Sequence, residues 1–285
     1  DVNKKEELSE GEVFGTCDPA YADQLFGGWM RAGKGGKEKT LKRRSPLSIS
    51  AMRPLHPSLA GIAQENATFD RSDRSNNKVI VRDEKGNELS DEAVKALLEG
   101  KDRSLNRKWI PNNNRASGLF VSDIAIDLRR LFSVTLNPFE PEVAPEVEAQ
   151  LLSDGWIKSE NVFGPCLVAP KALRDKWMPA LVDALLNWRI TSNQSRTFSL
   201  METLAVAVSD NAHKIAASIR TKLDEEDRAK PIIEESLDGV QTFVTLPAAG
   251  YLKTLTESAD AIDRARAYLL QQLSAFDYEN QLQSV

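Results

Sequence analysis

The chain has 285 residues, of which 41% are hydrophobic and 28% charged, and its formal net charge is −5. This is the composition of a globular protein, and no apolar run approaches the roughly 18 residues that a membrane span requires, which argues against disorder and against a membrane partner. The two cysteines, Cys17 and Cys166, cannot make a disulfide framework, so they favour a reducing, cytoplasmic location.

Charge is distributed unevenly along the chain. Residues 31–130 carry 21 Lys and Arg against 13 Asp and Glu, whereas residues 201–285 carry 8 against 14. A basic part and an acidic part in one chain indicate an anionic partner, and the acidic part could also meet the basic part of a second copy. Segregation of surface charge by chance is the alternative.

The N-terminal part is predicted to be a polar arm followed by an apolar patch that fills the core, where Gly27–Gly28 argues against a rigid helix. A basic run follows, and its glycines predict a flexible strap that becomes ordered when nucleic acid or a neighbouring copy is present. Its cations are Arg31, Lys34, Lys37, Lys39, Lys42, Arg43 and Arg44.

Alternating residues predict a strand over 45–53, with Leu47, Ile49 and Ala51 on one face. Arg53 and His56 leave this strand beside Pro54 and Pro57, which makes a stiff basic corner. Residues 56–115 are then poor in apolar side chains and too long for an ordinary connection, so they are predicted to be an inserted functional lobe.

Residues 117–136 have the strongest strand pattern in the chain, with an alternation that extends to Leu128 and one slip at Ser122–Asp123 that a bulge would give. Helices are predicted over 145–152 and 171–188, and an extended segment over 162–170 separates them. Pro179 should kink the second helix, whose apolar face would consist of Leu173, Trp177, Leu181, Ala184, Leu185 and Trp188.

In the last third, residues 196–208 could form a helix or a strand, and the alternation at their end favours a strand. Residues 209–230 are polar and are predicted to be helical. A strand over 240–244 and a long helix over 251–276 complete the chain. Strands and helices interleave, which predicts an α/β or α+β sandwich made of one sheet with helices on one face.

The sequence contains none of the motifs of nucleophilic, metal-dependent or phosphate-binding catalysis. We therefore expect that the protein is not an enzyme and that it needs no cofactor or metal. His56 could contact a phosphate or a base, or have a structural role. Asp123, Asp127, Asp70 and Asp73 could in principle support metal-dependent cleavage of RNA, but solvated or ion-paired carboxylates are the more common case.

Basic residues interleaved with aromatic residues favour nucleic-acid binding, since cations track the phosphate backbone and rings stack on bases. Each such motif alone could be a solvated surface, but their concentration in one part of an acidic protein is more specific. The residues predicted here are Arg71 and Arg74, then Arg107, Lys108 and Trp109, then Arg115.

Three segments, SPLSISAMRPLHPSLA (45–60), TFDRSDR (68–74) and RASGLFVSDIAIDLRRLFSVTLN (115–137), resemble the backbone subunit of type I CRISPR Cascade complexes, and SNQSRTFSL (192–200) is similar to a further loop and strand of that family. The resemblance covers roughly residues 45–210. It implies an α+β fold with an RNA-recognition-motif-like palm over 1–55 and 116–285, a finger insertion over 56–115 and a thumb.

The resemblance further implies a non-catalytic subunit that binds the backbone of the guide RNA (crRNA) and polymerises head to tail along it. Other Cascade subunits and target DNA would be its further partners. The implied RNA contacts are Arg53 and His56 at the basic corner and Gln194 and Arg196 in the polar loop. Lys42, Arg43, Arg44 and Arg115 are added from the basic segments, and the finger cations would face DNA.

Two alternatives remain open at this point. One is a type III-like backbone subunit that cleaves target RNA with a metal and with Asp123 or Asp73. The other is a generic RNA- or DNA-binding regulator that acts as a monomer or dimer.

Overall fold

The computed structural model describes residues 17–33, 39–55, 118–187, 202–220 and 230–283, together with a few positions between 87 and 96. Apart from those few positions, they belong to the larger of two compact units, Cys17–Ile62, Ala116–Ile190 and Ser199–Val285. The smaller unit comprises Asp1–Thr16, Ala63–Arg115 and Thr191–Phe198. The predicted finger insertion, residues 56–115, therefore lies almost entirely outside the described residues.

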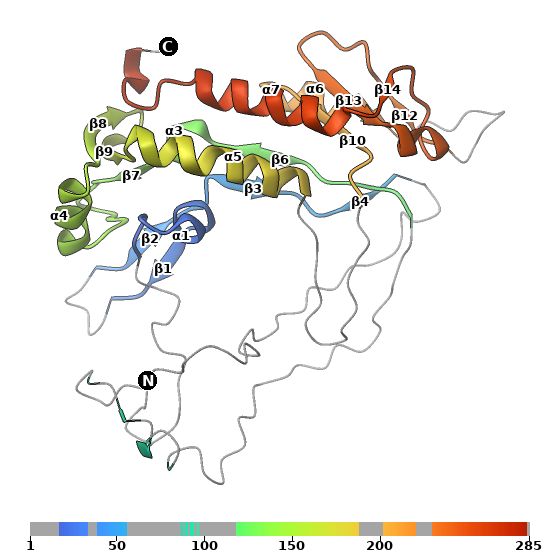
Figure 1. Cartoon of the computed structure of the whole chain (residues 1–285). Helices are drawn as coiled ribbons and strands as arrows, with labels where there is room; N and C mark the ends of the chain where they lie inside the picture. The colour runs from blue at the N-terminus through green and yellow to red at the C-terminus, as the bar shows by residue number, and fades with distance from the viewer. Residues whose placement is uncertain are drawn as a thin grey trace. The chain divides into compact units, whose positions relative to one another are not determined.

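The larger unit is a mixture of helices and short strands (Figure 1). Its described helices are α1 (Ala22–Gly27), α3 (Leu128–Leu131), α4 (Pro145–Ser153), α5 (Lys171–Asn187), α6 (Ala212–Ser218) and α7 (Ala261–Ala275), with 3₁₀ turns η3 (Leu246–Gly250) and η4 (Gln281–Gln283).

Its described strands are β1 (Trp29–Arg31), β2 (Leu41–Arg43), β3 (Leu47–Ile49), β4 (Arg53–Pro54), β5 (Phe120–Val121), β6 (Ile124–Ile126), β7 (Ser133–Thr135), β8 (Ile157–Asn161), β9 (Gly164–Val168), β10 (Ala205–Val208), β11 (Ile219–Arg220), β12 (Ile232–Ile233), β13 (Gln241–Thr245) and β14 (Glu257–Ser258). In the described part they form several small sheets of two or three strands, and the strand pairs are antiparallel except β13–β14. The α+β class with antiparallel sheets is confirmed, whereas the expectation of one continuous sheet is wrong for these residues.

Strands β3 and β4 run antiparallel to β6 and β5 as one interrupted ribbon. Leu47 lies opposite Ile126 and Arg53 lies opposite Val121. Between the two paired stretches, residues 50–52 face residues 122–123, so the extra residue is in the first strand. The predicted irregularity at Ser122–Asp123 is confirmed, because strand pairing is interrupted there. The extra residue, however, belongs to the opposite strand, within residues 50–52.

The predicted alternation through Leu128 is wrong in its last step, because the strand ends at Ile126. The Asp127 side chain accepts a hydrogen bond from the backbone N–H of Arg129 at 3.2 Å and so caps the short helix α3. The chain returns to a strand at Ser133, in β7, which pairs with β9.

The predicted extended segment over 162–170 is confirmed as β9, the central strand of the β7–β9–β8 sheet. Its hairpin partner β8 was missed because its sequence, IKSEN, lacks a continuous apolar face. The helices predicted on either side are confirmed: α4 starts at Pro145, and α5 continues through Pro179 to Asn187.

The predicted apolar face of α5 is confirmed at Leu181, whereas the other buried positions lie one residue after the predicted ones. The buried positions are Arg174, Met178, Leu181, Val182 and Leu186. The predicted residues Leu173, Trp177 and Leu185 pack against the core only in part, and Ala184 is exposed. Helix α7 packs against α5 and against β13 (Figure 1).

The last third differs from prediction mainly in the extent of its helices. Strand β13 confirms the prediction over 240–244, and β10 confirms a strand at the end of 196–208. The long helix predicted over 251–276 begins only at Ala261, and the segment before it contains β14. The polar helix predicted within 209–230 is the short α6, which leads into β11.

Two hydrophobic clusters hold the unit together. The larger contains Phe132 and Leu167, which are fully buried, and extends to Leu25 and Trp29 of the N-terminal segment. The predicted core-filling role of that segment is therefore confirmed for Leu25, Phe26 and Trp29, whereas Tyr21 and Met30 of the same apolar patch are exposed. A smaller cluster joins Leu55 to Val244 and Leu252.

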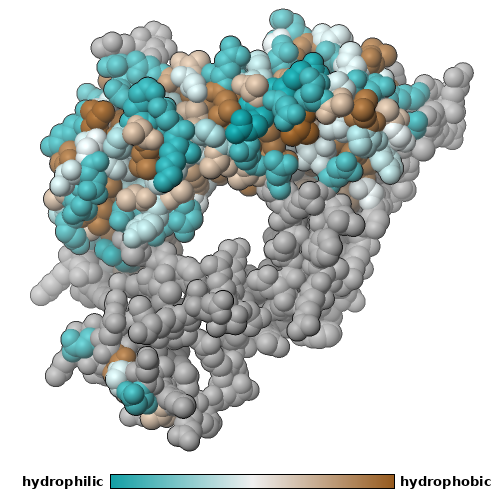
Figure 2. Space-filling model, viewed as in Figure 1, coloured by the Kyte–Doolittle hydropathy of each residue, from teal (hydrophilic) through white to brown (hydrophobic). Residues whose placement is uncertain are grey.

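On the face shown in Figure 2, hydrophobic residues of the described elements form separate patches between hydrophilic ones.

Candidate nucleic-acid interface

The basic run enters a β-ribbon, since β1 pairs with β2 antiparallel. The prediction of a strap over 31–44 that is unordered without a partner is therefore wrong for Arg31 and for 41–43, which lie in strands, while residues 34–38 lie outside the described part. Successive strand residues point to opposite faces, so Lys42 and Arg44 are exposed and Arg43 is buried. A run of three cations thus contributes two residues to the surface and one to the core.

Helix α1 ends where this ribbon begins, at Gly28, which has φ of 75°. A Cβ at this position would lie 2.5 Å from the carbonyl oxygen of Arg43 and 2.7 Å from the backbone N of Ser45. The earlier prediction that the two glycines exclude a helix is wrong. Gly28 instead ends a short helix and allows two backbone segments to approach closely.

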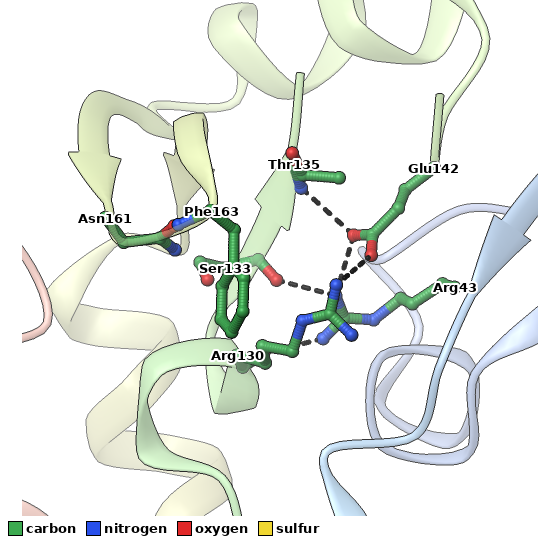
Figure 3. A pocket seen from close by; sticks show the side chains of 7 residues that line it. All are labelled: Arg43, Arg130, Ser133, Thr135, Glu142, Asn161 and Phe163. Carbon is green, nitrogen blue, oxygen red and sulfur yellow. Dashed lines mark hydrogen bonds and ion pairs between the residues drawn. The ribbon is translucent and has the colours of Figure 1, made fainter. Parts of the chain in front are cut away.

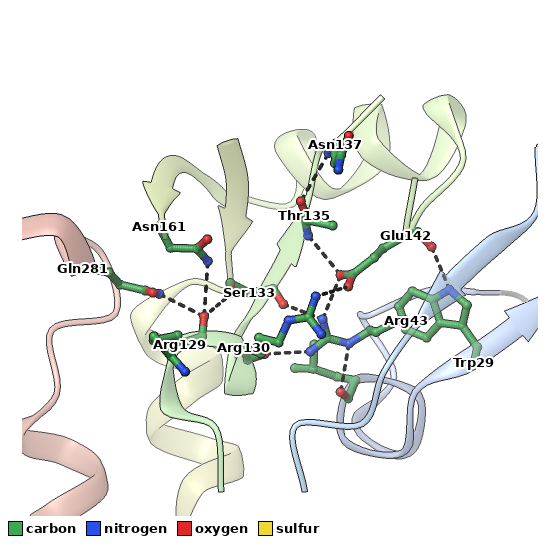
Figure 4. Close-up of polar contacts among 11 residues, drawn as sticks. Trp29, Arg43, Arg129, Arg130, Ser133, Thr135, Asn137, Glu142, Asn161 and Gln281 are labelled. Atoms are coloured by element: carbon green, nitrogen blue, oxygen red, sulfur yellow. Dashed lines mark hydrogen bonds and ion pairs between the residues drawn. The ribbon is translucent and has the colours of Figure 1, made fainter. Parts of the chain in front are cut away.

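Arg43 is 3% exposed and its guanidinium is enclosed by acceptors (Figure 4). Nη1 donates to the carbonyl of Ser133 at 2.7 Å and to Oε2 of Glu142 at 2.9 Å, and Nη2 donates to the carbonyl of Arg130 at 2.7 Å. Nε donates to the carbonyl of Leu25 at 3.2 Å. The three nitrogens are thus all engaged within the protein, which argues against the predicted RNA contact of Arg43 and assigns it a structural role.

The partner carboxylate, Glu142, is equally enclosed (Figure 3). It accepts a hydrogen bond from the backbone N–H of Thr135 at 3.0 Å, and Nη2 of Arg130 lies 3.6 Å from its second oxygen. Burial lowers the pKa of Arg43, and the Glu142 carboxylate opposes that shift. The free space beside the pair holds about one water molecule, so it is too small for an organic ligand.

Arg53 of β4 forms an exposed contact with Asp123, which lies in the break between β5 and β6. Their side chains form an ion pair, with 54% and 37% of their surfaces exposed. Residues 48–51, which precede Arg53, are exposed as well, including Ile49 at 55%. The Arg53 guanidinium is exposed, and the residues before it include the small Ser48, Ser50 and Ala51, so an anion can reach it.

A second cationic cluster was missed in the sequence. The guanidinium carbons of Arg129 and Arg130 lie 5.4 and 4.7 Å from the ring centroid of Phe163, in the turn between β8 and β9. The backbone that carries them is fixed, because the Arg129 carbonyl accepts from Ser133, Asn161 and Gln281 (Figure 4). The pair Arg129–Arg130 is visible in the sequence, but its ring partner is more than 30 positions away.

The remaining predicted contacts lie outside the described residues: His56, Arg71, Arg74, Arg107, Lys108, Trp109, Arg115, Gln194 and Arg196. Asp73, the other candidate catalytic carboxylate of the ribonuclease alternative, also lies outside the described residues. Within the described ranges, no group of three or more His, Cys, Asp or Glu side chains is placed to hold a metal. None of the helices in that part of the chain has the length and apolarity to cross a membrane.

Comparison of the chain with protein-family models, curated proteins and solved structures finds no match in any of the three.

Proposed function

We propose that this protein is a non-catalytic subunit that binds the phosphate backbone of a guide RNA and assembles along it in several copies, as a backbone subunit of a Cascade-type complex. The α+β unit would be the RNA-recognition-motif-like palm, and the segment 56–115 would be the finger. Target DNA and other subunits of the complex would be its further partners. The proposal draws on the sequence resemblance and on the exposed cations of the β-ribbons.

The observation that carries the proposal is the exposed Arg53 at the end of the β3–β4 strand. Its partner Asp123 is also exposed, and an ion pair in that setting contributes only about 0 to 1 kcal/mol. A phosphate can therefore take the place of the carboxylate at small cost and gain bidentate contacts to the guanidinium.

Lys42 and Arg44 give the β1–β2 ribbon an outward-facing pair of cations of the same kind. Contacts from such cations to phosphates do not depend on the base sequence, which suits a guide RNA whose sequence varies. The acidic C-terminal part supplies a surface of opposite sign, as a head-to-tail assembly requires. Asp123, the carboxylate of the ribonuclease alternative that lies within the described residues, is ion-paired with Arg53. Because so exposed a pair is displaced by a metal ion as readily as by a phosphate, RNA cleavage with a divalent metal is the assay that separates the two proposals.

The test is the affinity for labelled single-stranded RNAs of unrelated sequence, measured by fluorescence anisotropy over a range of salt concentrations. We expect similar affinities for all sequences and a steep loss with salt. Arg53→Ala should lose affinity by about 3- to 10-fold and lower the salt slope by about one.

Arg264→Ala is the matched control. Its side chain is 51% exposed and pairs with the exposed Asp260, but it lies on α7 in the acidic part. Equal affinity of the Arg53→Ala and Arg264→Ala proteins would overturn the role of Arg53. Absence of RNA binding by the unmodified protein would overturn the proposal itself.

A further inference from the structure

An exposed phenylalanine stands next to the β1–β2 ribbon and has no role in the core. Phe139 is 87% exposed and lies between Pro138 and Pro141, in the loop after β7. Phe163, by contrast, is 43% exposed and has two guanidinium groups over its ring. Exposure alone assigns no role to the ring, since Leu255 is exposed to the same extent, at 89%.

The loop that presents Phe139 is held in a defined conformation. Oδ1 of Asn137 accepts from the backbone N–H of Phe139 at 2.9 Å, and Asn137 N–H donates to Oγ1 of Thr135 at 3.2 Å. The flanking prolines further restrict the backbone. The ring is therefore presented by a preorganised turn, which reduces the entropy that binding would cost.

Two lysines of the basic run lie against the same loop. Nζ of Lys39 donates to the carbonyl of Pro138, and the backbone N–H of Lys42 donates to the carbonyl of Pro141 at 3.2 Å. The side chains of both lysines are exposed, and the loop itself contributes one exposed acid, Glu140. The next carboxylate, Glu142, is buried and paired with Arg43. The exposed charge on the loop and on the two lysines that are hydrogen-bonded to it is therefore net positive.

We propose that Phe139 is a stacking platform for one base of a single-stranded nucleic acid, and that Lys39 and Lys42 hold the adjoining phosphates. This inference rests on the proposed function and adds a residue to which nothing so far assigns a role. Proteins that bind single-stranded nucleic acids combine aromatic side chains, which stack on bases, with cations, which contact the phosphates.

The size of the exposed feature argues against a protein partner. A phenylalanine buries about 150 to 250 Å², whereas a stable protein interface buries roughly 1,200 Å² or more. On this ribbon Met30 is the other large exposed apolar side chain within the described residues, at 75%. A stacked base, in contrast, increases affinity by roughly 5- to 150-fold through a single ring.

The test compares Phe139→Tyr, Phe139→Leu and Phe139→Ala in binding to a labelled single-stranded RNA. Stacking needs a flat ring, so Phe139→Tyr should keep the affinity, while the leucine and alanine variants should lose about 5-fold or more. The salt slope should stay unchanged in Phe139→Ala, because stacking releases no counterions, whereas Lys42→Ala should lower it by about one.

Leu255→Ala is the control for removal of an exposed apolar side chain, since Leu255 is 89% exposed and lies in the acidic part. A Phe139→Trp variant gives a second readout: RNA should quench its fluorescence more than it quenches that of the unmodified protein, which has five tryptophans, and an acidic peptide should not produce this difference. If the leucine variant binds RNA as tightly as the unmodified protein, the stacking site is refuted and the proposed function stands. If the unmodified protein binds no RNA, the proposed function itself fails.

Discussion

Nη1 of Arg43 lies 2.9 Å from Oε2 of Glu142, and the two side chains are 1% and 3% exposed. The pair joins strand β2 to the loop after β7 and fixes the backbone on which Arg130 and Ser133 lie. The surface cations Lys42 and Arg44 therefore depend on a buried cation between them for their position.

Removing one partner of this pair should destabilise the protein strongly. We expect Arg43→Ala to lower the free energy of unfolding by about 3 to 5 kcal/mol, because it leaves the Glu142 carboxylate buried without its counter-charge. Urea denaturation measures the change, with Arg264→Ala as the exposed counterpart, which should cost less than about 1 kcal/mol. A loss for Arg43→Ala as small as that of the control would contradict the structural role of Arg43.

Gly28→Ala should also destabilise the protein, by about 2 kcal/mol or more. Its φ of 75° is unfavourable for alanine, and the added Cβ would collide with backbone atoms of Arg43 and Ser45. Gly27→Ala is the matched control, because its Cβ would meet nothing within 4 Å. Thermal unfolding of the two variants should separate them clearly, and equal midpoints would show that the close approach at Gly28 is absent.

Cys166 should make stability decline in alkaline solution. Burial raises the pKa of its thiol from 9.0 to about 11. Its contribution to stability is therefore fully present below pH 9.0, the value of an unperturbed thiol, and is lost as pH rises to about 11. The slope in this window should be about 1 kcal/mol per pH unit steeper for the native sequence than for Cys166→Ala. Parallel urea denaturation curves for the two proteins across this window would refute the shift.

Asp123→Asn should strengthen RNA binding by roughly two- to three-fold, because it removes the carboxylate that competes with phosphate for Arg53. Asp260→Asn, which alters the equivalent exposed pair on α7, should leave the affinity unchanged. Anisotropy titrations with one labelled RNA measure both. The ribonuclease alternative predicts something different, namely that the unmodified protein cuts RNA with a divalent metal and that Asp123→Asn abolishes the cuts.

Periodicity predicted the elements whose apolar pattern is sustained. Helices α4 and α5 and strand β13 occur close to where they were predicted, and in α5 buried residues recur along the helix from Arg174 to Leu186. Helix α3 was missed because Leu128, its first residue, continues the alternation of apolar residues in the preceding strand and so was assigned to that strand. The capping residue Asp127 before a leucine–arginine run was the available signal.

The candidate site was predicted less completely, because charge in a sequence does not reveal which face a residue occupies. Lys42, Arg43 and Arg44 are equivalent as a basic run, and only the pairing of β2 with β1 separates them. Burial alternates in β2, where Leu41 and Arg43 are buried on either side of the exposed Lys42, but the sequence does not show it, because Arg43 is charged and Met30, beside the buried Trp29, is apolar. The contact of Arg129 and Arg130 with Phe163 is a tertiary contact that local pattern does not encode.

The central claim is that many copies of this chain assemble on one RNA. The most direct measurement is the mass of the complex by light scattering with single-stranded RNAs of increasing length. The proposal predicts that the mass grows in steps of one 31.6 kDa chain plus a fixed increment of RNA. A complex that stays at one or two chains whatever the length of the RNA would contradict it.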